Sequence, residues 1–319
     1  MTDVFSMTRD PLRWEQLATY PPRPFVRYRA DVPGPLRIAR RSPTGGRPAT
    51  VSILIPTLDA DRGGYLPRLL DQLEDQTYQD WELLLVAGDR RQGRALNVAA
   101  SLATGAYLLT LDDDTRLISP RALESVVIAA DADPTIGAAG GINLISPDAP
   151  PFVTRAMREI PRRTTAPVTT VTDSDLAEHP FLLIRRDVFV SAGGENELIP
   201  RGLDPYLREM IRQLGYRIVV VPGADYSHWP PPTLRKLLAQ FFRNGMAAAF
   251  VNQHYPQWAI ETPADHGPFR PRVPRLQRVL RFPFRLTQAL ATGKPVWFLC
   301  QIAYAAGFLR QWVRPKEGV

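Results

Sequence analysis

The stretch Tyr107-Leu-Leu-Thr-Leu-Asp-Asp-Asp114 says most about the fold and the chemistry of this chain. Residues 107–111 form an apolar run typical of a short buried strand, so the three carboxylates should emerge together at its carboxyl end. Like charges this close are costly unless a cation lies among them. A hard divalent ion with oxygen ligands, Mg²⁺ or Mn²⁺, would remove that cost and usually also holds a substrate diphosphate. The alternative is a solvated acidic turn, with Thr115 and Ser119 as competing caps of the next helix.

Strands and helices alternate on both sides of this stretch. Residues 51–56 read as a buried strand, 65–76 as a helix with apolar residues at helical spacing, and 81–86 as the next strand. The same patterns predict a helix over 94–103, a helix over 122–130, a strand over 137–144, a strand over 181–184, helices over 187–192 and 207–214, and a strand over 216–221 ended by Pro222. Such alternation predicts an α/β fold with a mostly parallel central sheet, covered by helices on both faces, that binds ligands beyond the strands' carboxyl ends.

Composition divides the chain into three parts. Residues 1–48 are rich in Pro and Arg, which disfavours helix and central strand alike, so we expect an extended arm. Residues 49–250 carry the alternating pattern and form the expected catalytic domain. Within it, residues 146–180 are irregular and proline-containing, as in a substrate-side loop or edge strands. Residues 251–319 form a basic, partly amphipathic helical extension.

The overall composition limits the class of protein. With 319 residues, 45% hydrophobic and 22% charged, the chain can bury one large core, or one core and an appended subdomain. A formal net charge of +7 suits an anionic partner, whether nucleotide, phosphorylated lipid, membrane surface or nucleic acid. The single cysteine, Cys300, excludes an internal disulfide framework and a Cys-rich metal site. The amino terminus lacks the basic-then-apolar order of a secretory signal, so we expect a cytoplasmic protein.

The order of these segments resembles the family 2 glycosyltransferases, nucleotide-sugar enzymes of the GT-A fold. The resemblance covers residues 50–250 and rests on the order and spacing of its parts rather than on any one of them. The matching segments are Val51-Ser-Ile-Leu-Ile-Pro-Thr57, the passage 73–86, Arg94-Ala-Leu-Asn97, the stretch 103–114, residues 183–189 with Gly193-Gly194, Gly202-Leu-Asp-Pro-Tyr-Leu207, the passage 214–222 and His228.

The resemblance implies a nucleoside-diphosphate sugar donor, a Mn²⁺ or Mg²⁺ ion, and displacement at the anomeric carbon with inversion. It makes Asp114 and His228 the metal ligands and Asp112 or Asp113 a nucleotide contact, because the triplet matches the family's DxD segment. His228 read alone, between Ser227 and Trp229, is more typical of a surface histidine than of a metal ligand. Asp204 matches the proposed general base, whose alternative role is helix capping. The resemblance further assigns substrate or nucleotide contacts to Pro56, Asp89, Arg94, Asn97 and, near the donor diphosphate, Arg243.

The sequence differs from the family pattern at two places. An aspartate that usually follows the second strand and reads the base is replaced by Val86-Ala87-Gly88, with Asp89 as the shifted candidate. The glutamate before the general base is Leu203 here, and the usual Gly-Gly-Phe-Asp-Glu is Gly193-Gly-Glu-Asn-Glu197. These departures keep open a non-catalytic nucleotide-sugar or membrane-binding protein. A sugar-phosphate nucleotidyltransferase is disfavoured, because residues 56–61 lack a glycine-rich basic loop.

Positive charge is concentrated towards the carboxyl end. Arg275, Arg278, Arg281 and Arg285 recur at helical spacing with apolar residues between them, although Pro283 should kink or interrupt the helix. This stretch and the apolar segment 296–309, too short to span a bilayer, could lie on an anionic membrane surface, which would make the protein peripheral at the inner face of the membrane. They could equally pack on the catalytic domain or on a second subunit of a homo-oligomer. No nucleic-acid-binding module is recognisable. The acceptor stays open among small-molecule, lipid-linked and glycan hydroxyls.

Overall fold

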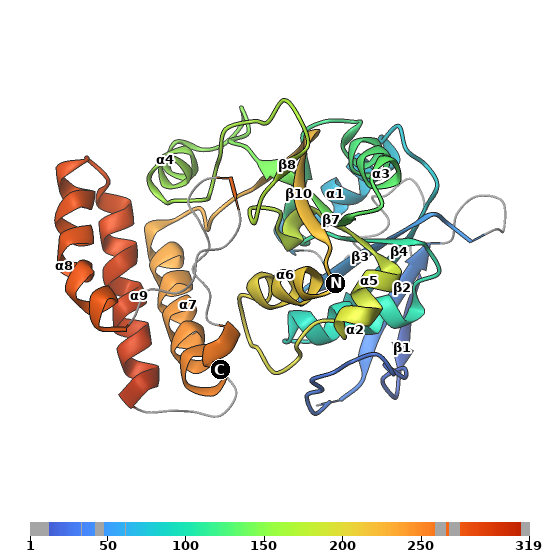
Figure 1. Ribbon diagram of the computed structural model, residues 1–319, viewed down its shortest axis with the longest axis horizontal. Helices are drawn as coiled ribbons and strands as arrows, with labels where there is room; N and C mark the ends of the chain where they lie inside the picture. Colours follow the sequence, from blue (N-terminus) through green and yellow to red (C-terminus); the bar gives the residue numbers. More distant parts are fainter. Residues whose placement is uncertain are drawn as a thin grey trace.

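The computed structural model describes residues 13–32, 34–41, 48–60, 62–258, 266–267 and 275–313. Within them a ten-stranded sheet has the order β1-β2-β4-β3-β5-β9-β7-β10-β6, and β8 pairs with β10 (Figure 1). The strands are β1 Trp14–Leu17, β2 Leu36–Arg41, β3 Val51–Thr57, β4 Trp81–Ala87, β5 Tyr107–Thr110, β6 Thr115–Leu117, β7 Ile136–Asn143, β8 Thr172–Asp173, β9 Leu182–Arg185 and β10 Arg217–His228. The helices are α1 Tyr65–Glu74, α2 Gln92–Leu102, α3 Ala122–Ala132, α4 Pro151–Glu159, α5 Arg186–Ala192, α6 Asp204–Gln213, α7 Leu234–His254, α8 Arg275–Ala291 and α9 Pro295–Val313.

The sheet is mixed in direction. Strand β3 runs parallel to β4 and β5, and β7 runs parallel to β10, as expected from the helices that connect them. Strand β9 lies between these two groups and is antiparallel to both β5 and β7. The predicted α/β fold is therefore confirmed, while the sheet contains more antiparallel pairing than a mostly parallel sheet would.

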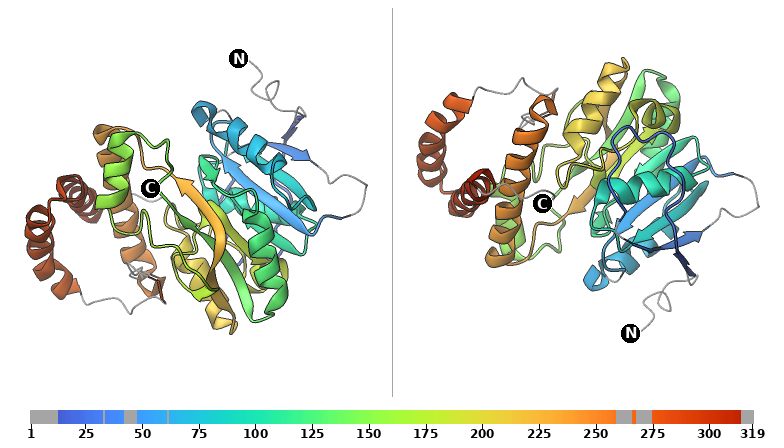
Figure 2. Two further views of the ribbon diagram at one scale, coloured as in Figure 1. Left: turned by 90° about the horizontal axis from the view of Figure 1, so that it is seen from above. Right: turned by 90° about the horizontal axis from the view of Figure 1, so that it is seen from below.

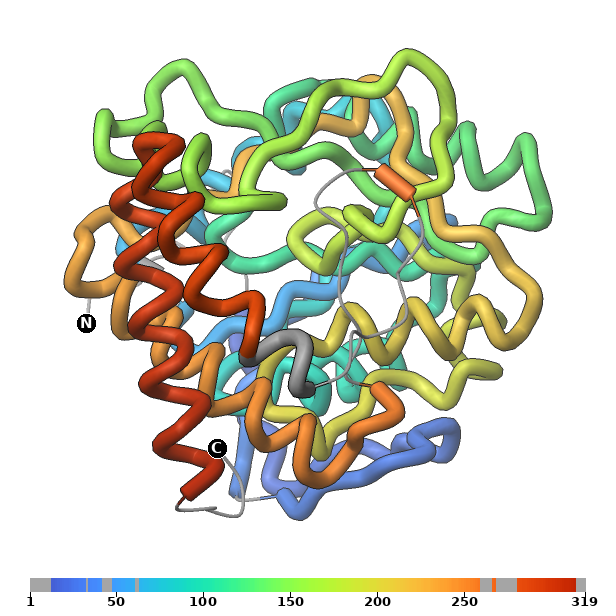
Figure 3. Tube along the Cα trace, turned by 60° about the vertical axis from the view of Figure 1, so that its left-hand side comes forward, coloured from blue at the N-terminus to red at the C-terminus, as the bar shows by residue number. Residues whose placement is uncertain are grey.

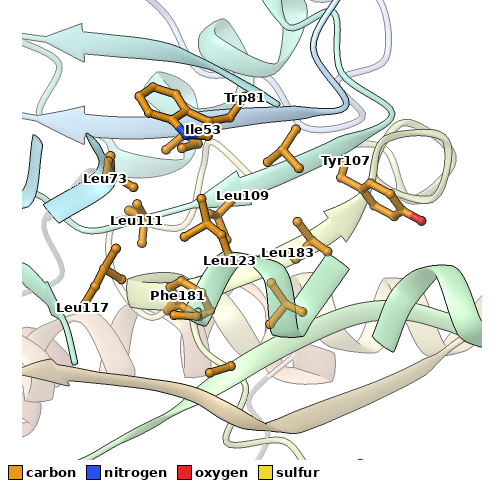
Figure 4. Packing of buried hydrophobic residues seen from close by; sticks show 14 of the residues in the cluster. Ile53, Leu73, Trp81, Tyr107, Leu109, Leu111, Leu117, Leu123, Phe181 and Leu183 are labelled. Atoms are coloured by element: carbon orange, nitrogen blue, oxygen red, sulfur yellow. The ribbon is translucent and has the colours of Figure 1, made fainter. Parts of the chain in front are cut away.

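Helices cover both faces of the sheet, and each face has its own apolar core. On one face Leu66, Leu69 and Leu73 of α1 and the apolar side of α3 pack on Ile53, Leu109 and Leu183 of the strands (Figure 4). On the other face α2, α5 and α6 pack on the opposite side chains of the same strands. Successive strand residues point to opposite faces, so a strand buried on both faces reads as the continuous apolar run seen in the sequence.

The amino-terminal arm adds two strands to the sheet, which the sequence did not predict. Strand β2 pairs antiparallel with β4, and β1 pairs with β2 at the edge. The proline-rich segment between them lies on the body through a buried ion pair, in which Arg23 Nε and Nη2 donate to Glu197 Oε1 and Oε2 at 2.7 and 3.0 Å. Glu197 is fully buried and also accepts from the backbone N–H of Ala30 at 3.0 Å. Residues 14–32 and 34–41 are thus an integral part of the folded structure.

Two further elements differ from the expectation. Helix α4 lies within residues 146–180, which the prolines marked as irregular; Pro151 occupies the first turn, where proline is tolerated because no intrahelical N–H partner is needed there. Strand β10 continues beyond Pro222 to His228 through a register shift between Val220 and Asp225, with Gly223 at φ +77°. This irregularity accommodates the proline and carries the strand six residues further, to the histidine that the sequence singled out.

Helices α7, α9 and α8 form a layer at one side of the molecule, remote from β1 and β2 (Figures 1 and 2). Helix α9 packs along α7, and the two backbones approach closely where Gly245 and Gly307 meet the other helix. A small core of Ala156, Ile160, Leu237, Phe241, Val296 and Cys300 joins α4, α7 and α9. Helix α8 packs chiefly on α9 and is the outermost element of this layer, which Figure 3 turns towards the viewer. None of the helices in the described ranges combines the length and apolar character that a membrane span requires.

Candidate active site

The acidic triplet lies at the carboxyl end of β5, where the chain turns into β6. The backbone N–H of Thr115 donates to the carbonyl of Asp112 at 3.0 Å and closes this turn. Strand β6 then pairs antiparallel with the end of β10, and Thr115 lies opposite His228. Because of this pairing, residues more than one hundred positions apart in sequence become neighbours, and His228 Nε2 lies 3.1 Å from Asp114 Oδ1 and 3.8 Å from Asp112 Oδ2.

Asp112, Asp114 and His228 form a half-buried group that is suited to a divalent cation. One ligand atom from each side chain lies within 4.8 Å of the others. Burial raises the pKa of Asp112 to about 6, and the neighbouring Asp114 adds to this effect while His228 opposes it. Burial disfavours the imidazolium of His228, but Asp114 and Asp112 outweigh burial and raise its pKa. Two carboxylates with one imidazole are a donor set that fits Mn²⁺ or Mg²⁺.

Asp113 points away from this group and ties the turn to the first strand of the β-α-β unit. Its side chain is buried, and its Oδ2 accepts a hydrogen bond of 2.6 Å from Thr57 Oγ1 at the end of β3. Asp112 is instead reached by Gln92 of α2, whose Nε2 donates to Oδ1 at 2.8 Å. The three members of the triplet therefore have different surroundings. Asp112 and Asp114 lie beside His228, whereas Asp113 is bonded to Thr57.

Asp204 begins α6 and is held by His179, a residue that the sequence analysis missed. Its Oδ1 accepts from the backbone N–H of His179 at 2.9 Å and lies 2.5 Å from the ring atom Nδ1. The other ring nitrogen, Nε2, lies 2.6 Å from Glu195 Oε1. His179 and Glu195 are buried, whereas the Asp204 side chain keeps 24% of its surface exposed.

Charge in this buried trio is arranged around the imidazole. Burial by itself disfavours the charged ring, but the carboxylates of Asp204 and Glu195 outweigh that cost and raise the pKa of His179 well above its ordinary value. Burial likewise disfavours the charged Asp204, but His179 and then Arg208 outweigh it and lower the pKa of Asp204. Both ring nitrogens of His179 lie at hydrogen-bond distance from a carboxylate oxygen, an arrangement that favours the imidazolium, in which both nitrogens donate.

The metal-suited group and Asp204 share one electrostatic environment. The charges of both His179 and Asp204 influence the pKa of Asp112. The irregular loop after α4 contributes two more ionisable groups that the sequence did not identify. Arg163 is influenced by Asp114 and donates to Gln240 Oε1 of α7 at 3.2 Å, and burial lowers its pKa. Burial and then Asp204 raise the pKa of Glu178. The expectation that residues 146–180 form a substrate-side loop is consistent with this position.

Three of the residues predicted to contact the nucleotide lie in a different, buried network. Asp89 accepts four hydrogen bonds: from Tyr20 Oη at 2.9 Å, from the Arg91 N–H at 2.8 Å, and from Arg94 Nε and Nη2 at 2.6 and 2.7 Å. Asn97 is fully buried and exchanges hydrogen bonds with the backbone of Glu195 at 2.8 and 3.0 Å. These contacts join α2 to the amino-terminal arm and leave the carboxylate of Asp89 without an evident role in reading a base. No signal in the sequence distinguishes this arrangement from a ligand contact, because both use the same polar residues after β4.

The remaining predicted residues have no contact in the described part of the chain that assigns them a role. Pro56 is half-buried near the end of β3, opposite Val86 of β4. Arg243 is exposed on α7, three residues after the Gln240 that Arg163 contacts. Leu203, which replaces the family's glutamate, is buried against α2, where its methyl carbons would lie 3.3 Å from a Cβ at Gly93.

The chain is similar to known proteins in sequence over part of its length and in fold over most of it. Residues 87–191, about a third of the sequence, match the family model Glycosyl transferase family 2. No curated protein sequence matches the chain. Among solved structures, the chain is similar to the mannosyltransferase PcManGT from Pyrobaculum calidifontis in complex with GDP-Man and Mn²⁺, with a TM-score of 0.55 and 17% identity over 86% of this chain and 90% of that one.

A second solved structure, S. aureus TarS 1–349 in complex with UDP, has 12% identity and a TM-score of 0.40 over 84% of this chain and 92% of that one, a likeness too distant to carry an argument. At 17% identity the likeness to PcManGT shows the fold alone. The family model and the fold nevertheless agree with each other and with the segments quoted from the sequence. The predicted resemblance is therefore confirmed over residues 87–191, which match the family 2 glycosyltransferase model, and the fold agrees with the predicted GT-A fold.

Proposed function

We propose that this protein is a metal-dependent, inverting glycosyltransferase that transfers a sugar from a nucleoside-diphosphate sugar to a hydroxyl acceptor. The observation that carries the proposal is the convergence of Asp112, Asp114 and His228, together with the position of Asp204 within electrostatic reach of Asp112. The glycosyltransferase match of residues 87–191 and the similarity in fold to a mannosyltransferase described with GDP-Man and Mn²⁺ support it.

The donor diphosphate is proposed to bind beside the triplet. Asp112, Asp114 and His228 would hold a Mn²⁺ or Mg²⁺ ion, which when bound neutralises negative charge on the departing diphosphate. Arg163 adds a cation on the loop after α4 that is within electrostatic reach of Asp114. Arg243, exposed one helical turn beyond Gln240, is proposed to reach the same diphosphate from α7. Gln92 keeps Asp112 oriented through its 2.8 Å hydrogen bond.

Asp204 is proposed to accept the proton of the acceptor hydroxyl. The acceptor oxygen forms a bond to the anomeric carbon while the bond from that carbon to the diphosphate oxygen breaks, which inverts the configuration. Both hydrogen bonds from His179 reach Asp204 Oδ1, so the proton would go to Oδ2. General-base assistance of this kind contributes about 10²–10⁴-fold to a rate.

His179 fixes the position of this base and weakens it. An imidazolium against Oδ1 holds the carboxylate in one orientation but lowers its pKa. A weaker base takes the proton only when the hydroxyl has become acidic through bonding to the anomeric carbon. Proton transfer is therefore expected late in the reaction rather than before it.

A transfer assay tests the proposal. The purified protein is incubated with a panel of UDP-, GDP-, ADP- and dTDP-sugars, with Mn²⁺ or with EDTA, and release of nucleoside diphosphate is measured. We expect metal-dependent release with at least one donor, at least 100-fold slower in Asp204→Asn and at background in Asp114→Asn, while Glu15→Gln on exposed β1 serves as the matched control.

Two results would contradict the proposal. Turnover at the wild-type rate in Asp204→Asn would remove the proposed base. Metal-dependent nucleotide binding without turnover of any donor would instead favour the non-catalytic binding protein, for which the buried Leu203 in place of a glutamate is the supporting observation.

A further inference from the structure

Helix α9 carries an apolar stripe that faces away from the rest of the protein. Leu299, Ile302, Leu309 and Val313 follow the spacing of one helix face, and their side chains are 37%, 44%, 61% and 73% exposed. The helix is already anchored on its other side, where Val296, Cys300 and Gly307 are buried against α4 and α7. The stripe is thus additional to the packing that holds α9 in place.

Helix α8, which packs on α9, also carries exposed apolar residues. Leu280 and Phe284 are both 67% exposed and Leu290 is 52% exposed, whereas Ala289 is buried. On a helical wheel the three exposed residues fall on one side and Ala289 on the opposite one. Pro283 lies inside the helix without ending it, so of its two expected effects the interruption does not occur. Large apolar side chains that gather on one outward surface are uncommon in soluble proteins and mark interaction sites.

The charge around this surface is of one sign. Among the described side chains of residues 280–313, four are basic, at 281, 285, 294 and 310, and none is Asp or Glu. Arg281 and Arg285 directly follow the exposed Leu280 and Phe284 in sequence and are themselves exposed. Arginines in this position can extend towards anionic groups while their aliphatic stems cover apolar surface.

We propose that the surface formed by α8 and α9 docks on an anionic lipid bilayer, with the apolar residues inserted at the level of the head groups. An interfacial helix with an apolar face and a basic flank has the character that binds such surfaces, and each nearby cation contributes roughly 1 kcal/mol. A second copy of the chain is a poorer partner, because two copies would bring basic helices together without acids to neutralise them. This docking is independent of the proposed catalysis.

The test is sedimentation of the full-length protein with vesicles. Vesicles of equal parts phosphatidylglycerol and phosphatidylcholine are compared with pure phosphatidylcholine, at low and high salt. We expect binding to the anionic vesicles that weakens with salt, a drop of about fivefold for each of Arg281→Gln and Arg285→Gln, and a larger drop for Phe284→Ser with Leu309→Ser. Ile128→Ser, which removes a 56% exposed residue of α3 on the other side of the molecule, is the control and should bind unchanged.

Three outcomes would overturn the proposal. These are equal binding to neutral and anionic vesicles, absence of binding to either, and wild-type binding by the Phe284→Ser, Leu309→Ser double variant. Sedimentation velocity without lipid tests whether a second copy of the chain covers this surface instead. A dimer that dissociates in the Phe284→Ser, Leu309→Ser double variant would show that it does.

Discussion

His179 Nδ1 lies 2.5 Å from Asp204 Oδ1, and the backbone N–H of the same histidine donates to the same oxygen at 2.9 Å. One residue thus fixes the carboxylate proposed as the base through two contacts. The second ring nitrogen of His179 contacts Glu195. Glu195 is the third residue of Gly193-Gly-Glu-Asn-Glu197, the segment that differs from the family pattern. The altered segment therefore has a physical role: it supplies the buried carboxylate that keeps the histidine charged.

The His179 trio should make stability depend on pH in a defined way. The pKa of Asp204 is lowered from 3.8, so its contribution is present above that value and is lost as pH falls through the lowered pKa. The pKa of His179 is raised from 6.5, so its contribution is present below that value and is lost as pH rises through the raised pKa. The wild type should be most stable between these limits.

Replacing His179 tests this dependence. His179→Asn leaves two carboxylates facing each other without a cation and should cost about 3–5 kcal/mol near neutral pH. In urea unfolding from pH 3 to 9, the variant should lose stability as rising pH ionises the two unpaired carboxyl groups, and should lack the wild-type loss of stability above pH 6.5. His254→Asn, at an exposed histidine of α7, is the matched control. If the variant kept the wild-type dependence of stability on pH, the claim that His179 is charged between Asp204 and Glu195 would be wrong.

Asp89 is predicted to stabilise the fold rather than to bind the nucleotide. Its carboxylate is buried and accepts from Tyr20, Arg91 and Arg94. Asp89→Ala leaves the Arg94 guanidinium buried without its partner, which should cost about 3–5 kcal/mol. Calorimetry on the folded variant should give a nucleoside-diphosphate affinity within about twofold of the wild type, a difference of less than 0.5 kcal/mol. If Asp89→Ala kept the wild-type stability but bound the nucleoside diphosphate tenfold more weakly, Asp89 would be a nucleotide contact, as the sequence suggested.

The contact of α7 with α9 depends on two glycines. A Cβ at Gly307 would lie 2.0 Å from the carbonyl oxygen of Phe242, a distance that requires the helices to separate. Gly307→Ala gains about 1 kcal/mol of helix propensity, yet we expect a net loss of stability by urea unfolding because the clash is with backbone. Ala306→Gly, at the exposed neighbouring position, reports the propensity effect alone. A stabilised Gly307→Ala protein would contradict the close approach.

The sequence predicted the strands that position the site better than it predicted the polar contacts within the site. The strands ending at Thr57, Ala87 and Thr110 were recognisable because burial on both faces makes them continuous apolar runs. Strand β10 was predicted too short, since the register shift that accommodates Pro222 depends on pairing with β7 and not on local propensity.

Polar networks were the least predictable part. Asp89, Arg94 and Asn97 were expected beside a nucleotide, but each has enough partners within the chain, some contributed by the arm about seventy residues earlier. His179 and Arg163 carry no local signal, because each acquires its role from residues that only the fold brings near. Only the unusual acid in Gly193-Gly-Glu-Asn-Glu197 could have pointed to a buried cationic partner.

The central claim is that Asp112, Asp114 and His228 bind a divalent cation that anchors the donor diphosphate, and calorimetry tests it most directly. Mn²⁺ is titrated into the wild type, Asp114→Asn and His228→Gln, with and without GDP or UDP. Asp131→Asn, an acid on α3 that hydrogen-bonds Tyr107, serves as the control. The account predicts saturable Mn²⁺ binding by the wild type and the control, tightened by a nucleoside diphosphate, and at least tenfold weaker binding in both site variants. Wild-type Mn²⁺ affinity in Asp114→Asn and His228→Gln would contradict it.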